Sequence, residues 1–387
     1  MSTVPTMSKT ACQSRLSMQD AIDLFREASI HELGARALEM SQRMHPEPYR
    51  TYVVDRNINY SNWCTARCTF CNFKADPPSV RSRPGLPAGY VLSFDEIGRK
   101  IQELIEIGGT QVLLQGGLVP PAILGFEWYL DLLRFIKRQF PAIHVHAFSP
   151  PEIFAFARVF GMTIGDVLRR LQEAGLDTIP GGGAEILVDR VRDRISRGKA
   201  RTQEYLAVMR EAHRIGMRTT ATMMFGHIET FADRVEHLRQ IRELQDETGG
   251  FTAFICWTFQ PENTPLGRLR QWPAEPDAAG PGGPARLRDG RHLVLSDACD
   301  YLRTLAVARL FLDNIPNLQS SWVTQGPKIG QLALFFGAND MGSVMMEENV
   351  VSAAGTTYRL SEADIRRLIA DAGWQPRKRN CYYELLD

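Results

Sequence analysis

The chain has 387 residues and is nearly neutral, with 45 Lys and Arg against 44 Asp and Glu, so no charge excess calls for nucleic acid or a membrane surface as partner. No run reaches the roughly 18 apolar residues of a membrane span, and residues 1–19 are too polar for a secretory signal. Seven cysteines, an odd number, argue against a disulfide framework. These properties fit a cytoplasmic enzyme with a sizeable core.

Strand-like and helical segments alternate along the chain. Residues 17–44 have apolar side chains at helical spacing, and the β-rich residues 52–54 lead into a cluster of cysteines. Helices and strands then alternate as far as residue 259. The expected helices are 94–107, 126–140, 165–174, 202–215 and 232–247, and the expected strands are 111–114, 144–148, 178–179, 218–225 and 251–259.

This alternation predicts an α/β fold with a parallel sheet and right-handed crossovers. There are enough units for a full or partial (β/α) TIM-type barrel, which we prefer to a doubly wound sheet. We expect an N-terminal helical segment over residues 1–50, the barrel over 51–318 and a C-terminal closing segment packed on the barrel over 319–387. Residues 273–290, rich in Pro, Gly, Ala and Arg, are expected to be a surface insertion, because a helical pattern resumes at 295–312.

Polar or glycine-rich segments follow five of the expected strands. They are residues 115–117, 149–152, 181–185, 226–230 and 260–264. Each one alone can be a turn that needs positive φ. In a (β/α) barrel, however, the chemistry collects at the C-terminal ends of the strands. Five such segments at matching positions therefore predict the active-site end of the barrel.

Three cysteines, Cys64, Cys68 and Cys71, lie in one short loop directly after the first expected strand. Thiolates are soft ligands that select iron–sulfur clusters or zinc. Three ligands without a fourth nearby would leave one iron of a four-iron cluster open to bind a substrate. The alternatives are a zinc site completed by a distant His and three buried cysteines that bind nothing. The remaining cysteines, Cys12, Cys256, Cys299 and Cys381, are interpreted as isolated thiols.

The C-x3-C-x2-C spacing resembles the signature of the radical S-adenosylmethionine (SAM) enzymes. In that family three cysteines hold a [4Fe-4S] cluster, and the open iron binds SAM and splits it into methionine and a 5'-deoxyadenosyl radical. Phe70 matches the family's aromatic position near the adenine. The resemblance therefore implies a [4Fe-4S] cluster on Cys64, Cys68 and Cys71, with SAM as the second cofactor.

Segments outside the cysteine loop resemble one family within this superfamily, the dehypoxanthine futalosine cyclases (cyclic dehypoxanthinyl futalosine synthases) of menaquinone biosynthesis by the futalosine pathway. The resemblance covers nearly the whole chain from residue 17. The segments that carry it are 57–62, 179–187, 224–230, 257–264 and 337–340. Two features depart from the family pattern: residues 72–74 after the last cysteine, and the length of the insertion at 273–290.

This resemblance implies an oxidoreductase and cyclase that forms a C–C bond. The 5'-deoxyadenosyl radical would remove hydrogen from ribose C4' of dehypoxanthine futalosine, and the carbon radical would add to the attached benzoate ring. A low-potential flavodoxin or ferredoxin would supply the electron. The alternatives are a sibling radical SAM enzyme, similar to aminofutalosine synthase or to deazaflavin-forming enzymes, and a non-catalytic iron–sulfur or zinc protein.

Cofactor contacts are also expected by resemblance. Gln115, Gly116 and Gly117 resemble the segment that receives the amino group of SAM, with Gln in place of the usual Glu. Ser149 and Glu185 are candidates for polar contacts to the SAM ribose or carboxylate. The alternative is that both side chains have only a structural role and cap the end of a strand.

Catalytic candidates lie on two other segments. His227 and Glu229 are candidates for substrate contact or for the final proton transfer, because a neutral His accepts a proton near pH 7. A single His is more often structural. Asp340, with Asn339, is a candidate for substrate contact from the closing segment. Arg56 is a candidate partner for the benzoate carboxylate.

Overall fold

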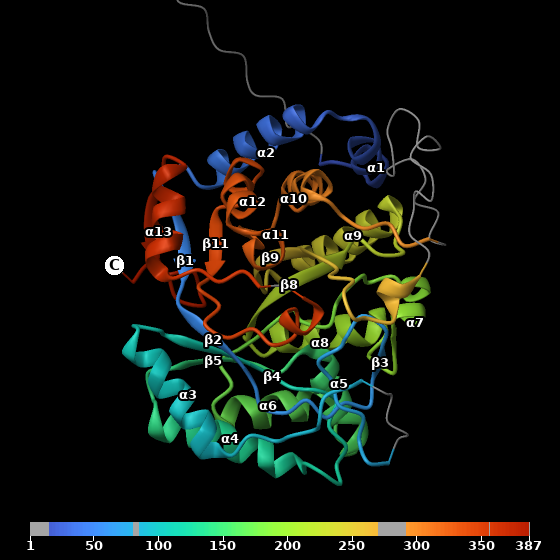
Figure 1. Cartoon of the computed structure of the whole chain (residues 1–387), viewed down its shortest axis with the longest axis vertical. Helices are drawn as coiled ribbons and strands as arrows, with labels where there is room; N and C mark the ends of the chain where they lie inside the picture. Colours follow the sequence, from blue (N-terminus) through green and yellow to red (C-terminus); the bar gives the residue numbers. More distant parts are fainter. Residues whose placement is uncertain (1–14, 80–84, 270–291, 356, 387) are drawn as a thin grey trace, which may run out of the picture.

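The structure is a computed structural model that describes residues 15–79, 85–269, 292–355 and 357–386 (Figure 1). The predicted insertion at 273–290 and Cys12 lie outside these residues. No helix in the described ranges is long and apolar enough to cross a membrane.

A ten-stranded sheet with parallel pairings forms the centre of the molecule, in the order β12-β1-β11-β10-β9-β8-β6-β5-β4-β2. A separate antiparallel pair joins β3 to β7. The strands are β1 Tyr49–Val53, β2 Asp55–Asn59, β3 Arg67–Cys68, β4 Gln111–Gln115, β5 His144–Ala147, β6 Thr178–Ile179, β7 Ser196–Arg197, β8 Arg218–Phe225, β9 Phe251–Thr258, β10 Asn317–Gln319, β11 Asp340–Ser343 and β12 Gln375–Lys378.

The run β1–β2 joins the two ends of this sheet. Only Val54 separates the two strands, yet β1 pairs with β11 whereas β2 pairs with β4. If β1–β2 is counted as one strand, it forms a closed ring of eight strands with β4, β5, β6, β8, β9, β10 and β11. β12 pairs with β1 outside this ring. The predicted TIM-type (β/α) barrel is confirmed.

Helices surround the ring, and most begin at a residue whose side chain caps them. In α3 the Ser93 hydroxyl accepts from the backbone N–H of Glu96, whose carboxylate accepts from Ser93 N–H. The helices are α1 Met18–Glu27, α2 Ile30–Met44, α3 Phe94–Glu106, α4 Phe126–Gln139, α5 Pro150–Val159, α6 Ile164–Ala174, α7 Asp189–Ile195, α8 Thr202–Arg214, α9 Phe231–Thr248, α10 Ala298–Phe311, α11 Trp322–Gln325, α12 Pro327–Leu332 and α13 Glu362–Asp371. α1 packs on α9 and α10, and α2 packs on α10.

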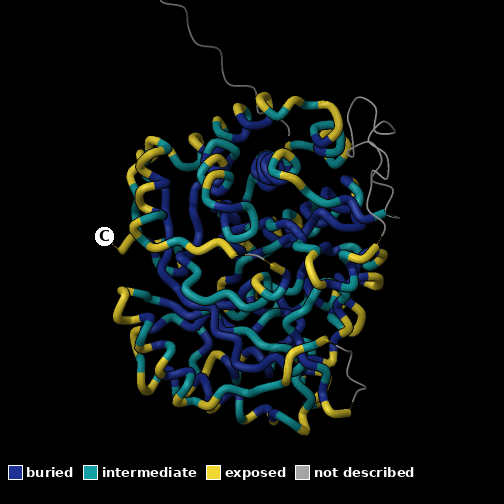
Figure 2. Tube along the Cα trace, viewed as in Figure 1, coloured by how far each residue is buried: buried dark blue, intermediate teal, exposed yellow. Residues whose placement is uncertain are grey.

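The C-terminal part of the chain completes the barrel. β10 and β11 are strands of the ring, so the predicted domain boundary at residue 318 differs from the structure and falls inside β10. The sequence pattern concealed this because the two strands have only three and four residues. The strands lie in the buried interior, whereas exposed segments follow the outer helices (Figure 2). A core cluster that includes Ile58, Leu114, Val145 and Phe254 fills the space between strands and helices.

Candidate active site

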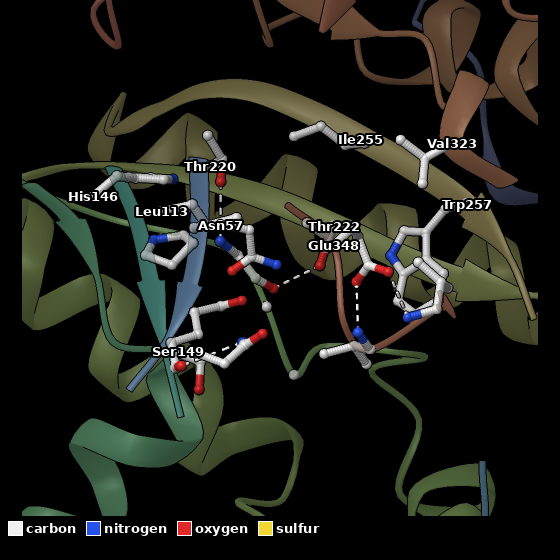
Figure 3. A pocket seen from close by; sticks show the side chains of 18 of the residues that line it. Asn57, Leu113, His146, Ser149, Thr220, Thr222, Ile255, Trp257, Val323 and Glu348 are labelled. Atoms are coloured by element: carbon white, nitrogen blue, oxygen red, sulfur yellow. Dashed lines mark hydrogen bonds between the residues drawn. The ribbon is translucent and has the colours of Figure 1, made fainter. Parts of the chain in front are cut away.

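The barrel encloses a cavity of about 390 Å³ (Figure 3). The cysteine loop lines one end of it. Arg379, Cys381 and Tyr383, which follow β12, line the other. Between these ends the alternate residues Asp55, Asn57 and Asn59 of β2 contribute to the wall. The cavity therefore runs from the predicted cofactor site into the interior of the barrel.

The cysteine loop is fixed by backbone hydrogen bonds to three neighbouring segments. Cys64 N–H donates to Ala75 O at 3.0 Å, and Thr65 N–H donates to Leu118 O at 3.0 Å. β3, which contains Cys68, pairs with β7. Cys64, Cys68 and Cys71 all line the cavity. The loop thus presents three thiols at one cavity end.

Without bound metal, burial favours the neutral form of two of these thiols. Burial raises the pKa of Cys64, and it raises the pKa of Cys68 to about 12. Bound iron would hold the thiolate form that burial alone disfavours. The Sγ of Cys64 accepts a hydrogen bond from Leu118 N–H at 3.3 Å, the kind of contact that tunes cluster potentials. In the described residues no three His, Cys or carboxylate side chains are grouped closely enough for a single ion. A four-iron cubane does not need such a convergent group, because each cysteine binds a separate iron atom.

A buried ion pair lies beside the cysteine loop. Lys199 Nζ is 2.6 Å from Glu185 Oε1 and 5.4 Å from the centre of the Phe70 ring. The other carboxylate oxygen of Glu185 is buried and has no hydrogen-bond partner in the structure, although the residue lines the cavity. Glu185 also has a positive φ of 43°, which is uncommon for a non-glycine residue. An unpartnered carboxylate oxygen at this position suits a polar ligand that donates hydrogen bonds.

Gln115 is the last residue of β4, and Gly116 and Gly117 follow it. All three line the cavity next to the cysteine loop. Gly116 N–H donates to Glu152 Oε1 at 3.1 Å. Ser149 also lines the cavity, but its hydroxyl donates to Glu152 Oε2 at 2.6 Å and caps α5. The structure therefore brings the two predicted segments together through Glu152.

Sequence reasoning missed Lys199, and it gave Glu152 no role beyond its place in the segment 149–152. Glu152 completes a Ser-x-x-Glu capping box, a visible pattern, but the pattern gave no sign that the carboxylate also holds Gly116. Tyr60 adds a third donor, with its hydroxyl 2.5 Å from Glu152 Oε1. No sequence pattern indicated Lys199. Its place beside the cysteine loop depends on the pairing of β7 with β3.

Two amide side chains in the cavity wall have buried oxygens without a protein partner in the described part of the chain. Asn57 Oδ1 and Gln111 Oε1 are buried and have no hydrogen-bond partner among the residues that the structure describes. Thr220 and Thr222 line the wall too, but both hold Gly181: Thr220 Oγ1 accepts from its N–H at 2.9 Å, and Thr222 Oγ1 donates to its carbonyl at 2.6 Å. Buried acceptors without partners are costly, so they favour a polar substrate in this space.

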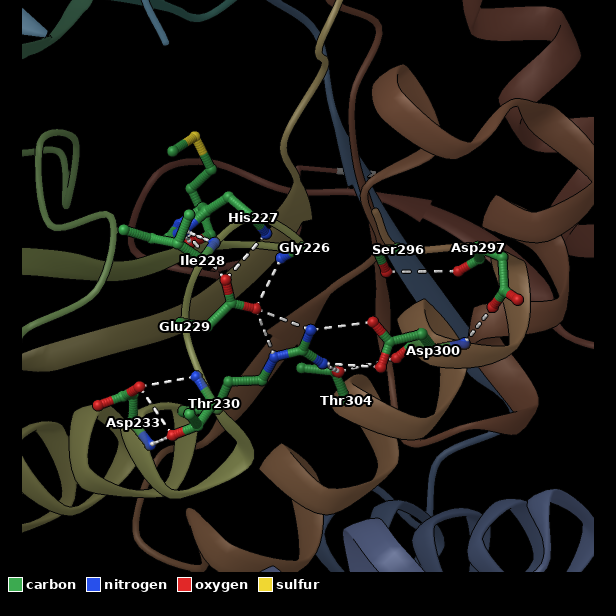
Figure 4. A network of polar contacts seen from close by, with 12 residues as sticks. Gly226, His227, Ile228, Glu229, Thr230, Asp233, Ser296, Asp297, Asp300 and Thr304 are labelled. Carbon is green, nitrogen blue, oxygen red and sulfur yellow. Dashed lines mark hydrogen bonds and ion pairs between the residues drawn. The ribbon is translucent and has the colours of Figure 1, made fainter. Parts of the chain in front are cut away.

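His227 and Glu229 do not line this cavity, in contrast to their predicted catalytic use. Both are fully buried in a network that fixes the turn after β8 (Figure 4). Glu229 accepts from Gly226 N–H at 2.8 Å and from Arg234 Nε at 2.9 Å. His227 Nδ1 is 3.0 Å from Glu229 Oε2, and its Nε2 is 3.2 Å from Met224 O. Their polar atoms are thus engaged in structural contacts.

Asp340 is also absent from the cavity lining, in contrast to its predicted contact with substrate. It accepts from Arg379 Nε at 2.6 Å and Nη2 at 2.9 Å, from Thr51 Oγ1 at 2.6 Å and from Gly342 N–H at 2.8 Å. Arg379 itself lines the cavity and stacks over the Tyr383 ring at 3.9 Å. Asp340 therefore holds a cavity residue in place.

Two further candidates have structural partners. Arg56 pairs with Glu103 at 2.6 Å and Glu347 at 2.8 Å and does not line the cavity. Asn339 accepts from Leu318 N–H at 2.9 Å and belongs to the β10–β11 contact. Arg56 is thus not placed to anchor a substrate carboxylate, and Asn339 does not line the cavity where it was expected to contact substrate.

Comparison with known proteins agrees with this geometry. Residues 58–241 match the radical SAM superfamily, and residues 285–387 match the CofH/MqnC C-terminal region. Methylornithine synthase has the same fold, with a TM-score of 0.65 at 17% identity over 94% of this chain and 95% of that one. The barrel and its cysteine loop thus define a radical SAM protein.

More similar relatives narrow the class to a family. Cyclic dehypoxanthine futalosine synthase of Halalkalibacterium halodurans is 45% identical over 96% of this chain and 92% of that protein. Its counterpart in Streptomyces coelicolor is 39% identical over 99% and 88%. The chain belongs to the cyclic dehypoxanthine futalosine synthase family, as the sequence segments predicted. The 5-amino-6-(D-ribitylamino)uracil–L-tyrosine 4-hydroxyphenyl transferase of Archaeoglobus fulgidus is 41% identical over 87% and 89%.

Proposed function

We propose that this chain is a radical SAM cyclase that converts dehypoxanthine futalosine to cyclic dehypoxanthine futalosine in menaquinone biosynthesis. The observation that carries the proposal is the 45% identity to a synthase of that name over 92% of its length. A barrel cavity with three cysteines at one end supports it. The proposal includes a cytoplasmic location and a low-potential flavodoxin or ferredoxin as electron donor.

In this proposal Cys64, Cys68 and Cys71 hold a [4Fe-4S] cluster with SAM beside it. When bound, the cofactors supply a 5'-deoxyadenosyl radical that removes the hydrogen atom at ribose C4', after which the carbon radical adds to the benzoate ring and one electron and one proton leave. The chain's task is to hold the substrate in one orientation and to exclude water and other hydrogen donors.

Side chains near the cysteine loop would position SAM. The backbone of Gln115, Gly116 and Gly117, held by Glu152, is proposed to receive its amino group. Glu185 is proposed to accept a ribose hydroxyl through the oxygen that has no protein partner. Phe70 is proposed to lie against the adenine, and Ser149 contributes by fixing Glu152.

Deeper residues would bind the substrate. Asn57 and Gln111 have unpartnered amide oxygens that suit the hydroxyl groups of a sugar. His227, Glu229 and Asp340 are proposed to act as positioning residues, because none of them lines the cavity. In particular, Asp340 would hold Arg379 at the cavity wall.

A substrate comparison tests the proposal. The protein is reconstituted with iron and sulfide without oxygen and incubated with SAM and a strong reductant. One sample receives dehypoxanthine futalosine, and the other receives 5-amino-6-(D-ribitylamino)uracil with L-tyrosine, the substrates named for the transferase relatives. We expect 5'-deoxyadenosine and a product lighter by two hydrogen atoms only in the first sample, and none from a Cys64→Ala variant. Product only in the second sample would contradict the proposal.

A further inference from the structure

His146 is a cavity residue with one ring nitrogen unused. It lies on β5, where the sequence predicted a strand but no site. Its Nδ1 is 2.7 Å from Thr178 Oγ1, and its Nε2 makes no hydrogen bond to any residue that the structure describes. Figure 3 shows His146 among the side chains that line the cavity. A histidine in the wall of a reaction chamber is a candidate proton acceptor.

Thr178, which contacts His146, also contacts a second histidine. Thr178 Oγ1 is also 2.7 Å from Nε2 of His144, the first residue of β5. His146 and Thr178 face each other in the parallel pairing of β5 with β6, so the sheet itself fixes their spacing. His146 and Thr178 are buried, whereas His144 is partly exposed. These three residues, which we call the histidine relay, lead from the cavity to the N-terminal end of the barrel.

The hydrogen-bonding capacities of the three groups permit a proton to pass. The Thr178 hydroxyl has one proton to donate and two lone pairs to accept with. In one consistent arrangement His146 Nδ1–H donates to Thr178, Thr178 donates to His144 Nε2, and His146 Nε2 keeps its lone pair for the cavity. Cys381 Sγ, 3.4 Å from Thr178 Oγ1, is the weak third neighbour of the hydroxyl.

The surroundings keep the inner histidine neutral. Burial, together with the charges of His144 and Arg379, lowers the pKa of His146 to about 3. A neutral imidazole is able to accept a proton, and a cationic one at this position is unstable and passes its proton on. Burial and the charge of Lys137 lower the pKa of His144 to about 4, a smaller shift than that of His146, because Asp177 acts in the opposite direction.

We propose that His146 accepts the proton that the cyclised benzoate ring loses and that the histidine relay conducts it out of the barrel. This proposal rests on the proposed cyclase function. The ring C–H bond would break with its electron pair staying in the ring. A cluster held by Cys64, Cys68 and Cys71, oxidised by the cleavage of SAM, would take up the one electron that the ring radical loses. The proton goes to His146 Nε2, the Nδ1 proton moves to Thr178, and the Thr178 proton moves to His144.

Two other carboxylates that line the cavity, Asp55 and Glu348, are less suited to this step. Asp55 accepts from Ser343 through one oxygen and from Gln111 Nε2 at 3.1 Å through the other. Glu348 accepts three backbone N–H groups at 2.8 to 2.9 Å. Neither carboxylate is hydrogen-bonded to a titratable group that leads away from the cavity, whereas His146 is.

The test compares His146→Gln, Thr178→Val and Thr178→Ser in the reconstituted holoenzyme with dehypoxanthine futalosine. Thr219→Val is a matched control, since Thr219 Oγ1 is 2.8 Å from Nε2 of His213 but does not line the cavity. Product and 5'-deoxyadenosine are measured in a single turnover, in H2O and in D2O. Freeze-quenched samples are examined by electron paramagnetic resonance for an organic radical.

We expect His146→Gln to slow product formation about 100-fold and Thr178→Val about 10-fold, with the first 5'-deoxyadenosine unchanged and an organic radical accumulating. Thr178→Ser should restore the native rate and solvent isotope effect, and Thr219→Val should match the native protein. Native rates and isotope effects in both His146→Gln and Thr178→Val would overturn the relay. If His146→Gln fails to fold, the comparison of Thr178→Val with Thr178→Ser tests the relay on its own. Absence of product from the native protein would overturn the proposed function instead.

Discussion

Gly117 shows how a single residue determines the geometry of the cofactor site. A Cβ atom at this position would lie 2.2 Å from the carbonyl oxygen of Trp63 and 2.7 Å from the Cβ of Cys64. Both distances are shorter than any real contact of a Cβ atom, and one of the two neighbours is backbone. The end of β4 can therefore approach the cysteine loop only because this residue has no side chain.

We accordingly expect Gly117→Ala to displace the cysteine loop. The variant should lose most of its reconstituted iron and sulfide and bind SAM at least about 10-fold more weakly, which corresponds to about 1.4 kcal/mol. Gly125→Ala is the control, because a Cβ at Gly125 would meet no atom within 4 Å and its φ of −76° suits alanine. Iron analysis and equilibrium binding of SAM are the measurements. Native iron content in Gly117→Ala would show that the loop tolerates the extra carbon.

Some residues of the site were predictable from sequence, and others were not. The spacing of Cys64, Cys68 and Cys71 is local, so it was visible without a fold. His146 and Arg379 were missed because each reaches the cavity only through the closure of the barrel, which places residues far apart in sequence side by side. His227 was overvalued for the opposite reason: its position after a strand suggested the cavity, but its ring turns into the core.

At the scale of elements, a buried ion pair joins three parts of the chain. Asp340 begins β11, Thr51 belongs to β1, and Arg379 follows β12. The Asp340 and Arg379 side chains are 0% and 4% exposed. Removal of one partner of such a pair leaves an uncompensated buried charge, which costs about 3–5 kcal/mol.

Asp340→Asn should therefore destabilise the protein by about 3–5 kcal/mol. The double variant Asp340→Asn with Arg379→Met should recover part of that loss, because no unpaired charge remains. Glu243→Gln is the control, since it breaks an exposed pair with Arg239 that is worth less than about 1 kcal/mol. Urea unfolding followed by fluorescence measures all three. If Asp340→Asn lowers the free energy of unfolding no more than the control does, the ion pair does not hold these elements together.

Periodicity predicted the longer elements and failed on the short ones. The apolar spacing of α3 and the length of β8 and β9 made them recognisable in the sequence. β10 and β11 are too short to establish a period, and glycine at position 342 further weakens the pattern of β11. The sequence therefore indicated a separate closing segment where the chain completes the ring.

At the scale of the whole molecule, the ring of strands creates one chamber with two different ends. The cysteine loop follows β2 at one end, and the segment after β12 lies at the other. A radical generated beside the cysteines would thus meet its substrate within the cavity of the barrel. In our proposal the proton leaves through the opposite end, away from the cysteine loop.

The central claim is that this chain generates a radical that abstracts hydrogen from the ribose of its substrate. The most direct measurement uses dehypoxanthine futalosine labelled with deuterium at C4', with the reconstituted protein, SAM and reductant. Mass spectrometry then follows the 5'-deoxyadenosine. We predict one deuterium atom in the 5'-deoxyadenosine formed with each cyclic product. Cyclic product accompanied by unlabelled 5'-deoxyadenosine would contradict the account.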